Sequence, residues 1–133
     1  MKIKMFFSLI FIFAAAGGLF LLGQQEQPEK IAIASDGETK ESQVAEQGGR
    51  CDWFLFFNAE GELLETAENP YKNERGGAGV SSADFLADKK ATVFVAGMVG
   101  GKMRDVLDSH EIEYISFSGT VEEALSHILQ KNE

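Results

Sequence analysis

The second half of the chain alternates between strand-like apolar segments and segments with helical spacing. Helical spacing covers Ser81–Lys89, the segment after Lys102 to about Ser109, and the segment after Thr120 to about Gln130. Thr120 and Glu123 predict a capping box at the start of the last helix. Between the helical segments lie two strand-like segments, Ala91–Ala96 and Ile112–Phe117. Strands that alternate with helices in this way predict a parallel sheet covered by helices.

The first half predicts antiparallel strands that extend the same sheet. Lys30–Asp36 has the composition of a buried strand, and Trp53–Asn58 is a dense aromatic one. The turn-like group Ala59–Glu62 and the segment Leu63–Glu68 complete a hairpin. In open α/β sheets, binding sites form outside the carboxyl ends of the parallel strands. We therefore expect the loops after Asp36 and after Ala96 to lie at the same end of the sheet.

An uncharged apolar segment, residues 5–23, precedes this domain. As a helix it would reach roughly 28 Å, close to the thickness of a bilayer core. Two interpretations are open: an uncleaved signal anchor, which we favour, or a signal peptide cleaved near Ala14–Ala16. Lysines before the segment predict a cytoplasmic N-terminus and a single-pass protein with its domain on the periplasmic side; cleavage would instead release a secreted protein. Residues 24–29 are a polar linker, and the domain covers residues 30–131.

Charge and composition exclude several classes of function. The formal net charge of −9 argues against a nucleic-acid-binding protein, because phosphate binding needs a basic surface. The single cysteine excludes an intramolecular disulfide framework. No Ser-His-Asp arrangement or H-E-x-x-H motif is present, so we expect a protein that is not an enzyme. The weakest alternative is a magnesium-dependent nuclease that uses Asp36.

Three glycine-rich loops are the candidate binding elements: Gln47–Cys51, Arg75–Gly79 and Gly97–Lys102. Backbone amides and arginines suit an anionic ligand, and a thiolate is a soft ligand for iron. The competing interpretation is a set of ordinary tight turns, with a half-buried structural cysteine in the first. His110 is expected to end a helix and His127 to lie on the last one, and both are expected to be structural or solvent-exposed. The candidate binding residues are Gln47, Gly48, Gly49, Arg50, Cys51, Arg75, Gly76, Gly77, Gly97, Met98 and Gly100, with Cys51 as the metal ligand.

An ordered set of short motifs resembles the dinitrogenase iron-molybdenum cofactor biosynthesis family of nitrogenase accessory domains. The matching pieces are Ile31–Gly37, Gly49–Phe54, Asn69-Pro70, Gly76–Gly79, Val95–Lys102 and Gly119–Leu125. The resemblance implies a ribonuclease-H-like fold, with three α/β/α layers around a mixed five-stranded sheet. It also implies non-catalytic binding of an iron-sulfur or iron-molybdenum-type cluster.

Two positions depart from the pattern of this family. Gln47 and Arg75 stand where many members carry histidines that can ligate iron. Our first hypothesis is a membrane-tethered domain that binds or carries such a cofactor or metal, with a cofactor donor or acceptor protein as its partner. The alternative is a cofactor-free protein-interaction module on the same fold.

Overall fold

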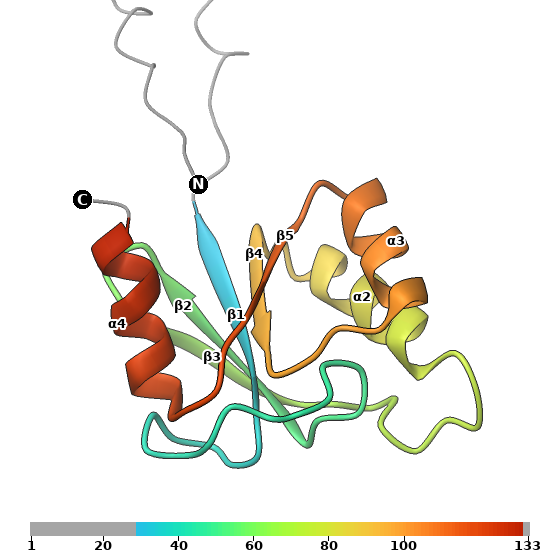
Figure 1. Ribbon diagram of the computed structural model, residues 1–133, viewed down its shortest axis with the longest axis horizontal. Helices are drawn as coiled ribbons and strands as arrows, with labels where there is room; N and C mark the ends of the chain where they lie inside the picture. Colours follow the sequence, from blue (N-terminus) through green and yellow to red (C-terminus); the bar gives the residue numbers. More distant parts are fainter. Residues whose placement is uncertain (1–28, 132–133) are drawn as a thin grey trace, which may run out of the picture.

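The computed structural model describes residues 29–131, which form a five-stranded mixed sheet with three helices (Figure 1). The strands are β1 (Lys30–Ser35), β2 (Trp53–Asn58), β3 (Leu63–Glu68), β4 (Val93–Ala96) and β5 (Glu113–Ser116), and the helices are α2 (Ala78–Asp88), α3 (Gly101–Ser109) and α4 (Val121–Lys131). The sheet order is β3-β2-β1-β4-β5. β1 is parallel to β4, and β4 to β5, whereas the β2–β3 hairpin is antiparallel. The mixed sheet and the hairpin confirm the prediction.

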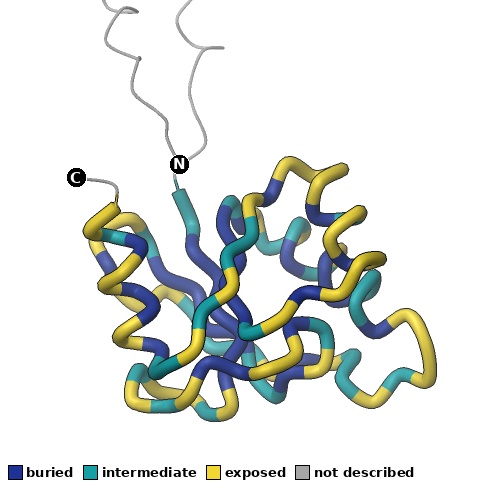
Figure 2. Tube along the Cα trace, viewed as in Figure 1, coloured by how far each residue is buried: buried dark blue, intermediate teal, exposed yellow. Residues whose placement is uncertain are grey.

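Two hydrophobic clusters separate the helices into layers on opposite faces of the sheet. Side chains of β1 alternate between them: Ala32 and Ala34 join the cluster that contains residues of α2 and α3, while Ile31 and Ile33 join the cluster that contains residues of α4. Figure 2 shows the buried strands between exposed helix surfaces. The small alanines leave room for the phenylalanines of β2 and β4 beneath α2 and α3, so the three layers follow from this alternation.

The last helix begins as the sequence predicts. The Thr120 backbone N–H donates to Glu123 Oε1 at 2.9 Å, and the Glu123 N–H donates to Thr120 Oγ1 at 3.1 Å. This reciprocal pair is a capping box, and it provides partners for two amides at the helix start.

Element boundaries differ from the prediction at several places. α2 begins at Ala78 instead of Ser81, because Gly77 takes a left-handed conformation (φ 80°) that starts the helix earlier. β4 and β5 are each shorter by two residues than predicted. The loop after β1 is irregular, and Val44 and Ala45 are buried in it.

The predicted N-terminal hydrophobic helix lies in residues 1–28, outside the described part of the chain. Within residues 29–131, the structure contains no helix long and apolar enough to cross a bilayer.

Candidate functional site

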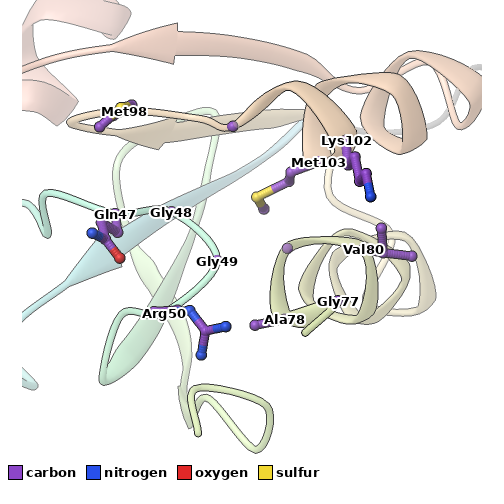
Figure 3. Close-up of a pocket in the computed structure, with 12 residues that line it drawn as sticks. Gln47, Gly48, Gly49, Arg50, Gly77, Ala78, Val80, Met98, Lys102 and Met103 are labelled. Atoms are coloured by element: carbon purple, nitrogen blue, oxygen red, sulfur yellow. The ribbon is translucent and has the colours of Figure 1, made fainter. Parts of the chain in front are cut away.

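A cavity of about 310 Å³ lies beside the carboxyl ends of β1 and β4 (Figure 3). It forms between the loop before β2, the start of α2 and the turn that leads into α3. Its wall consists of Gln47, Gly48, Gly49, Arg50, Gly77, Ala78, Gly79, Val80, Met98, Gly100, Lys102 and Met103. The sequence expectation that the loops after β1 and β4 meet at one end is therefore confirmed.

Backbone hydrogen bonds join these two loops. The N–H of Gly97 donates to the carbonyl of Ala45 at 2.8 Å, and the N–H of Met98 donates to that of Glu46 at 2.7 Å. In return, the Gly48 N–H donates to the Met98 carbonyl at 2.9 Å. The irregular loop thereby continues the parallel sheet by a short ladder beyond the carboxyl end of β1, and it fixes one wall of the cavity.

Glycines allow the loop before β2 to approach α2 and β4 closely. A Cβ on Gly49 would lie 2.7 Å from the Cα of Gly79, and a Cβ on Gly48 would lie 2.9 Å from the Phe94 ring. Contacts this short do not occur between real side chains and backbone, so two of the motif glycines serve packing. The first turn of α2 can then lie directly against the loop.

Buried polar side chains hold the carbonyl groups of this loop. The Asn69 side-chain amide donates to the carbonyls of Gly49 and Cys51 at 3.2 and 3.1 Å. Ser82 Oγ donates to the same Gly49 carbonyl at 3.0 Å. Asn69 and Ser82 are 3% and 0% exposed, so these bonds are shielded from water and fix the loop firmly.

Arg50 connects the loop to the segment that precedes α2. Its Nη1 donates to the carbonyls of Lys72 and Glu74 at 2.9 and 2.8 Å. Lys72 Nζ in turn lies 2.6 Å from Asp52 Oδ1. The guanidinium group is thus partly occupied by loop carbonyls, although Arg50 remains part of the cavity wall.

The cavity has a local charge opposite to that of the chain. Two cationic residues, Arg50 and Lys102, line it, whereas no carboxylate among the described residues does. α2 and α3 both begin at its wall, and within residues 29–131 neither start has a side-chain cap or an acidic residue in its first turn. Free amides at a helix start favour anions, so the wall is suited to a negatively charged ligand.

Comparison with known proteins shows which family the chain belongs to. The family described as "Dinitrogenase iron-molybdenum cofactor" matches residues 29–131. The chain belongs to this family. Among curated proteins, none matches the sequence closely enough to count as a relative.

Two solved structures place the chain beside other proteins with this fold. The apo form of the orange protein from Desulfovibrio gigas superposes with a TM-score of 0.74 and 26% identity, over 80% of this chain and 92% of that one. A NifB-like protein from Thermotoga, solved by NMR, has a TM-score of 0.67 and 26% identity, over 77% of this chain and 88% of the other. The predicted resemblance to the iron-molybdenum cofactor family is confirmed.

Most of the residues that the sequence singled out in this iron-molybdenum cofactor family domain come together. Seven of the predicted positions line the cavity: Gln47, Gly48, Gly49, Arg50, Gly77, Met98 and Gly100. Arg75 and Gly76 are exposed and lie outside the lining, and Gly97 packs against the Glu46 backbone instead. Ala78, Gly79 and Lys102 also line the cavity; they lie within the predicted loops but were not among the named binding residues, and Val80 and Met103 were missed altogether. Lys102 could have been found, because it follows a glycine turn at the start of a helix.

Cys51 lies beneath the cavity and is not part of its lining. Its side chain is 3% exposed, and its Sγ lies 3.6 Å from the Gly48 carbonyl oxygen, to which it donates. Burial raises the pKa of the Cys51 thiol from 9.0 to about 12, outweighing the hydrogen bond from Asn69, which lowers it. The thiol is therefore protonated at neutral pH, whereas iron binds the thiolate.

Other candidate ligands of this family domain are dispersed. Among the described residues, no three His, Cys, Asp or Glu side chains lie close enough to hold a metal ion. His110 ends α3, as predicted, and its Nε2 lies 3.1 Å from Asp84 Oδ1. His127 is exposed and packs against the Phe117 ring, with centroids 5.4 Å apart. Direct ligation by a protein cluster of these side chains has no support in the described geometry.

Proposed function

We propose that this domain binds and carries, without catalysis, an anionic cofactor of the iron-sulfur or iron-molybdenum type in the cavity. The observation that carries the proposal is the cationic wall, free of carboxylates within residues 29–131, on a chain of net charge −9. The two helix starts and Lys102 attract anions to the cavity, whereas the acidic remainder of the surface repels them.

The lining fits a preassembled cluster better than bare metal ions. Apart from the thioethers of Met98 and Met103, the described lining residues offer amides and cations, which bind anions but do not replace thiolate or imidazole ligands. A cluster that brings its own sulfide ligands needs only charge and hydrogen bonds from the protein. When bound, it would supply the iron chemistry, and the chain would hold and orient it.

Gly100 leaves space in the wall. A Cβ at this position would meet no described heavy atom within 4 Å, and its φ of −69° is ordinary for any residue. Neither packing nor backbone conformation therefore requires glycine here. The missing side chain enlarges the space that a ligand can occupy between the two helix starts.

Similarity to known proteins supports the same class of ligand. The matching family is described by its iron-molybdenum cofactor, and one structural neighbour at 26% identity was solved as an apo form. We further propose, from the sequence of residues 5–23, that the domain is tethered to the membrane on its periplasmic side, and that a second protein donates or accepts the cofactor.

Anaerobic reconstitution with a preassembled anionic iron-sulfur cluster, followed by desalting, tests the proposal. We expect charge-transfer absorption in the wild type and at least about tenfold weaker binding in Lys102→Glu, since one charge-assisted hydrogen bond contributes about 1.5 kcal/mol. Arg104→Glu is the matched control, because it makes the same charge change on α3 outside the lining. Equal loss in both variants, or no cluster in the wild type, would contradict the proposal.

A second pair of variants tests the space at Gly100. Gly100→Val should weaken cluster binding while leaving the fold intact, because the side chain would fill open cavity. Gly76→Val is the control, since it also meets no described atom within 4 Å and does not line the cavity.

Cys51→Ala should retain the absorption, whereas direct ligation through the thiol predicts its loss.

The alternative function is a cofactor-free interaction module. Met98 favours it, because the side chain is 51% exposed at the edge of the cavity. A partner protein that binds the wild type but not Met98→Glu, together with no cluster in the reconstituted wild type, would support this alternative over the cofactor.

A further inference from the structure

The loops that line the cavity and the start of the domain at β1 lie at opposite ends of the sheet (Figure 1). β1 begins at Lys30, which pairs with Asn58 at the end of β2. The tip of the β2–β3 hairpin therefore lies at the same end as Lys30. The cavity, in contrast, lies beside Met98 and Gly48, beyond the carboxyl ends of β1 and β4.

The hairpin exposes two consecutive leucines at that end. Leu63 and Leu64 are 48% and 52% exposed. Phe57 pairs with Leu63 and Phe56 with Glu65, so Leu64 is the extra residue of a β-bulge. Together with Met98 at the opposite end, they are the exposed large hydrophobic residues of the described chain. The last turns of α4 lie beside the turn of the hairpin, since a Cβ on Gly61 would lie 3.1 Å from Leu129 Cδ1.

The chain before β1 limits how far this end can lie from the apolar segment 5–23. Only residues 24–29 separate that segment from Lys30. Fully extended, such a linker spans at most about 20 Å. β3 is two strands away from β1 in the sheet, a lateral distance of about 10 Å. A membrane holding residues 5–23 is thus within reach of the hairpin leucines.

Charges at the hairpin indicate how deep such a contact can go. Glu60 and Glu62 flank the turn and are exposed, and the Asn58 side chain donates to Glu62 Oε1 at 2.9 Å. Buried carboxylates are costly, so the tip stays at the headgroup level and only the leucines contact the apolar boundary. With a net charge of −9, the chain favours a zwitterionic surface over an anionic one.

We propose that the hairpin end, through Leu63 and Leu64, rests on the bilayer that holds residues 5–23, so that the cavity opens away from the membrane. The proposal rests on the anchor interpretation of residues 5–23 and is independent of what the cavity binds. It presents the cavity to a soluble partner protein while the hairpin and the segment before β1 stay at the lipid surface.

Fluorophores on matched positions test this orientation. Leu64→Cys and Met98→Cys have nearly equal exposure in the native residue, 52% and 51%, at opposite ends of the domain. Each full-length variant is labelled and reconstituted in phosphatidylcholine vesicles, with brominated phosphatidylcholine as the quencher. Buried Cys51 should label slowly, and the wild type measures that background. We expect brominated lipid to quench the label at position 64 at least about twofold more than the label at position 98, because such quenching acts only at the bilayer.

Four results would overturn the proposal. Equal quenching at both positions would mean that neither end is oriented toward lipid, and stronger quenching at position 98 would reverse the orientation. If the full-length chain does not float with the vesicles, residues 5–23 do not anchor it in the bilayer. If the label at position 64 instead responds to protein concentration and not to brominated lipid, the hairpin docks on a second copy. Cluster binding by the protein in detergent tests the cavity separately. Failure of the orientation proposal is therefore distinguishable from failure of the cofactor proposal.

Discussion

The side-chain amide of Asn69 donates a hydrogen bond to the carbonyl oxygen of Cys51 at 3.1 Å, across 18 positions of the chain. The same amide donates to the Gly49 carbonyl, and its Oδ1 accepts from the Tyr71 N–H at 2.9 Å. One buried side chain therefore joins the loop that lines the cavity to the segment after β3. The carbonyls of Gly49 and Cys51 are thereby fixed by hydrogen bonds from one buried amide.

Asn69→Ala should destabilise the domain by about 2–4 kcal/mol, because it leaves the buried Cys51 carbonyl without its side-chain donor and the Tyr71 N–H without its acceptor. The loop should loosen, and Cys51 should react faster with a thiol reagent at pH 8. Urea unfolding and the rate of thiol labelling measure the two effects. Asn73→Ala is the control, since Asn73 is exposed in the following loop. Unchanged labelling in Asn69→Ala would show that this amide does not hold the loop closed.

Gly49→Ala should destabilise the fold by at least about 2 kcal/mol, because the added methyl group would collide with the Gly79 backbone at 2.7 Å. A backbone neighbour cannot rotate away as a side chain can. Gly76→Ala, in the second glycine motif, should change stability by less than about 0.5 kcal/mol, or raise it slightly. Thermal unfolding of both variants checks the difference, and similar losses would refute the assigned packing role.

The free energy of unfolding should fall at high pH because the Cys51 thiol is buried. The pKa of its thiol is raised to about 12 in the folded protein, above the 9.0 of an unperturbed thiol, so the folded state retains a proton that the unfolded state loses. The contribution is present below pH 9 and is lost progressively as pH rises toward 12. At pH 10.5 the loss should reach about 2 kcal/mol relative to pH 7. Urea unfolding of the wild type and of Cys51→Ala at both pH values isolates the contribution of Cys51, since the other groups titrate equally in both proteins.

Thr120→Ala should lower the free energy of unfolding by about 1 kcal/mol, because the Glu123 amide at the start of α4 loses its acceptor. Ser126→Ala, an exposed change on the same helix, should leave stability nearly unchanged. Chemical denaturation compares the two. If Thr120→Ala were neutral, water would replace the cap without cost.

Much of the fold could be predicted because its patterns are local. The aromatic β2 segment, the hairpin turn at Ala59–Glu62 and the capping box at Thr120 each depend on neighbouring residues, and all three are confirmed. The predicted start of α2 was wrong, because it depends on residues far apart in the chain. Gly77 and Gly79 read as loop residues, yet Gly77 takes a left-handed conformation before the helix, and Gly79, in the first turn, lies against Gly49 and Met103.

The candidate site was predictable only in part. Glycine-rich turns at Gln47–Cys51 and Gly97–Lys102 pointed to the right loops, and the order of the strands placed them at one end of the sheet. The orientation of individual side chains was not accessible. Cys51 turns under the loop toward Asn69, whereas Lys102, the last residue of the third glycine-rich loop, lines the cavity.

The sequence by itself determined the elements, their order and the membership of the iron-molybdenum cofactor family, because periodicity, turn residues and motif order are written along the chain. Only the tertiary structure decided which glycines pack against backbone and which leave space, and whether the cysteine faces a ligand or the core. These are relations between residues far apart in the chain, such as Gly49 with Gly79, and they are set by the distance between packed backbones, which no local pattern encodes.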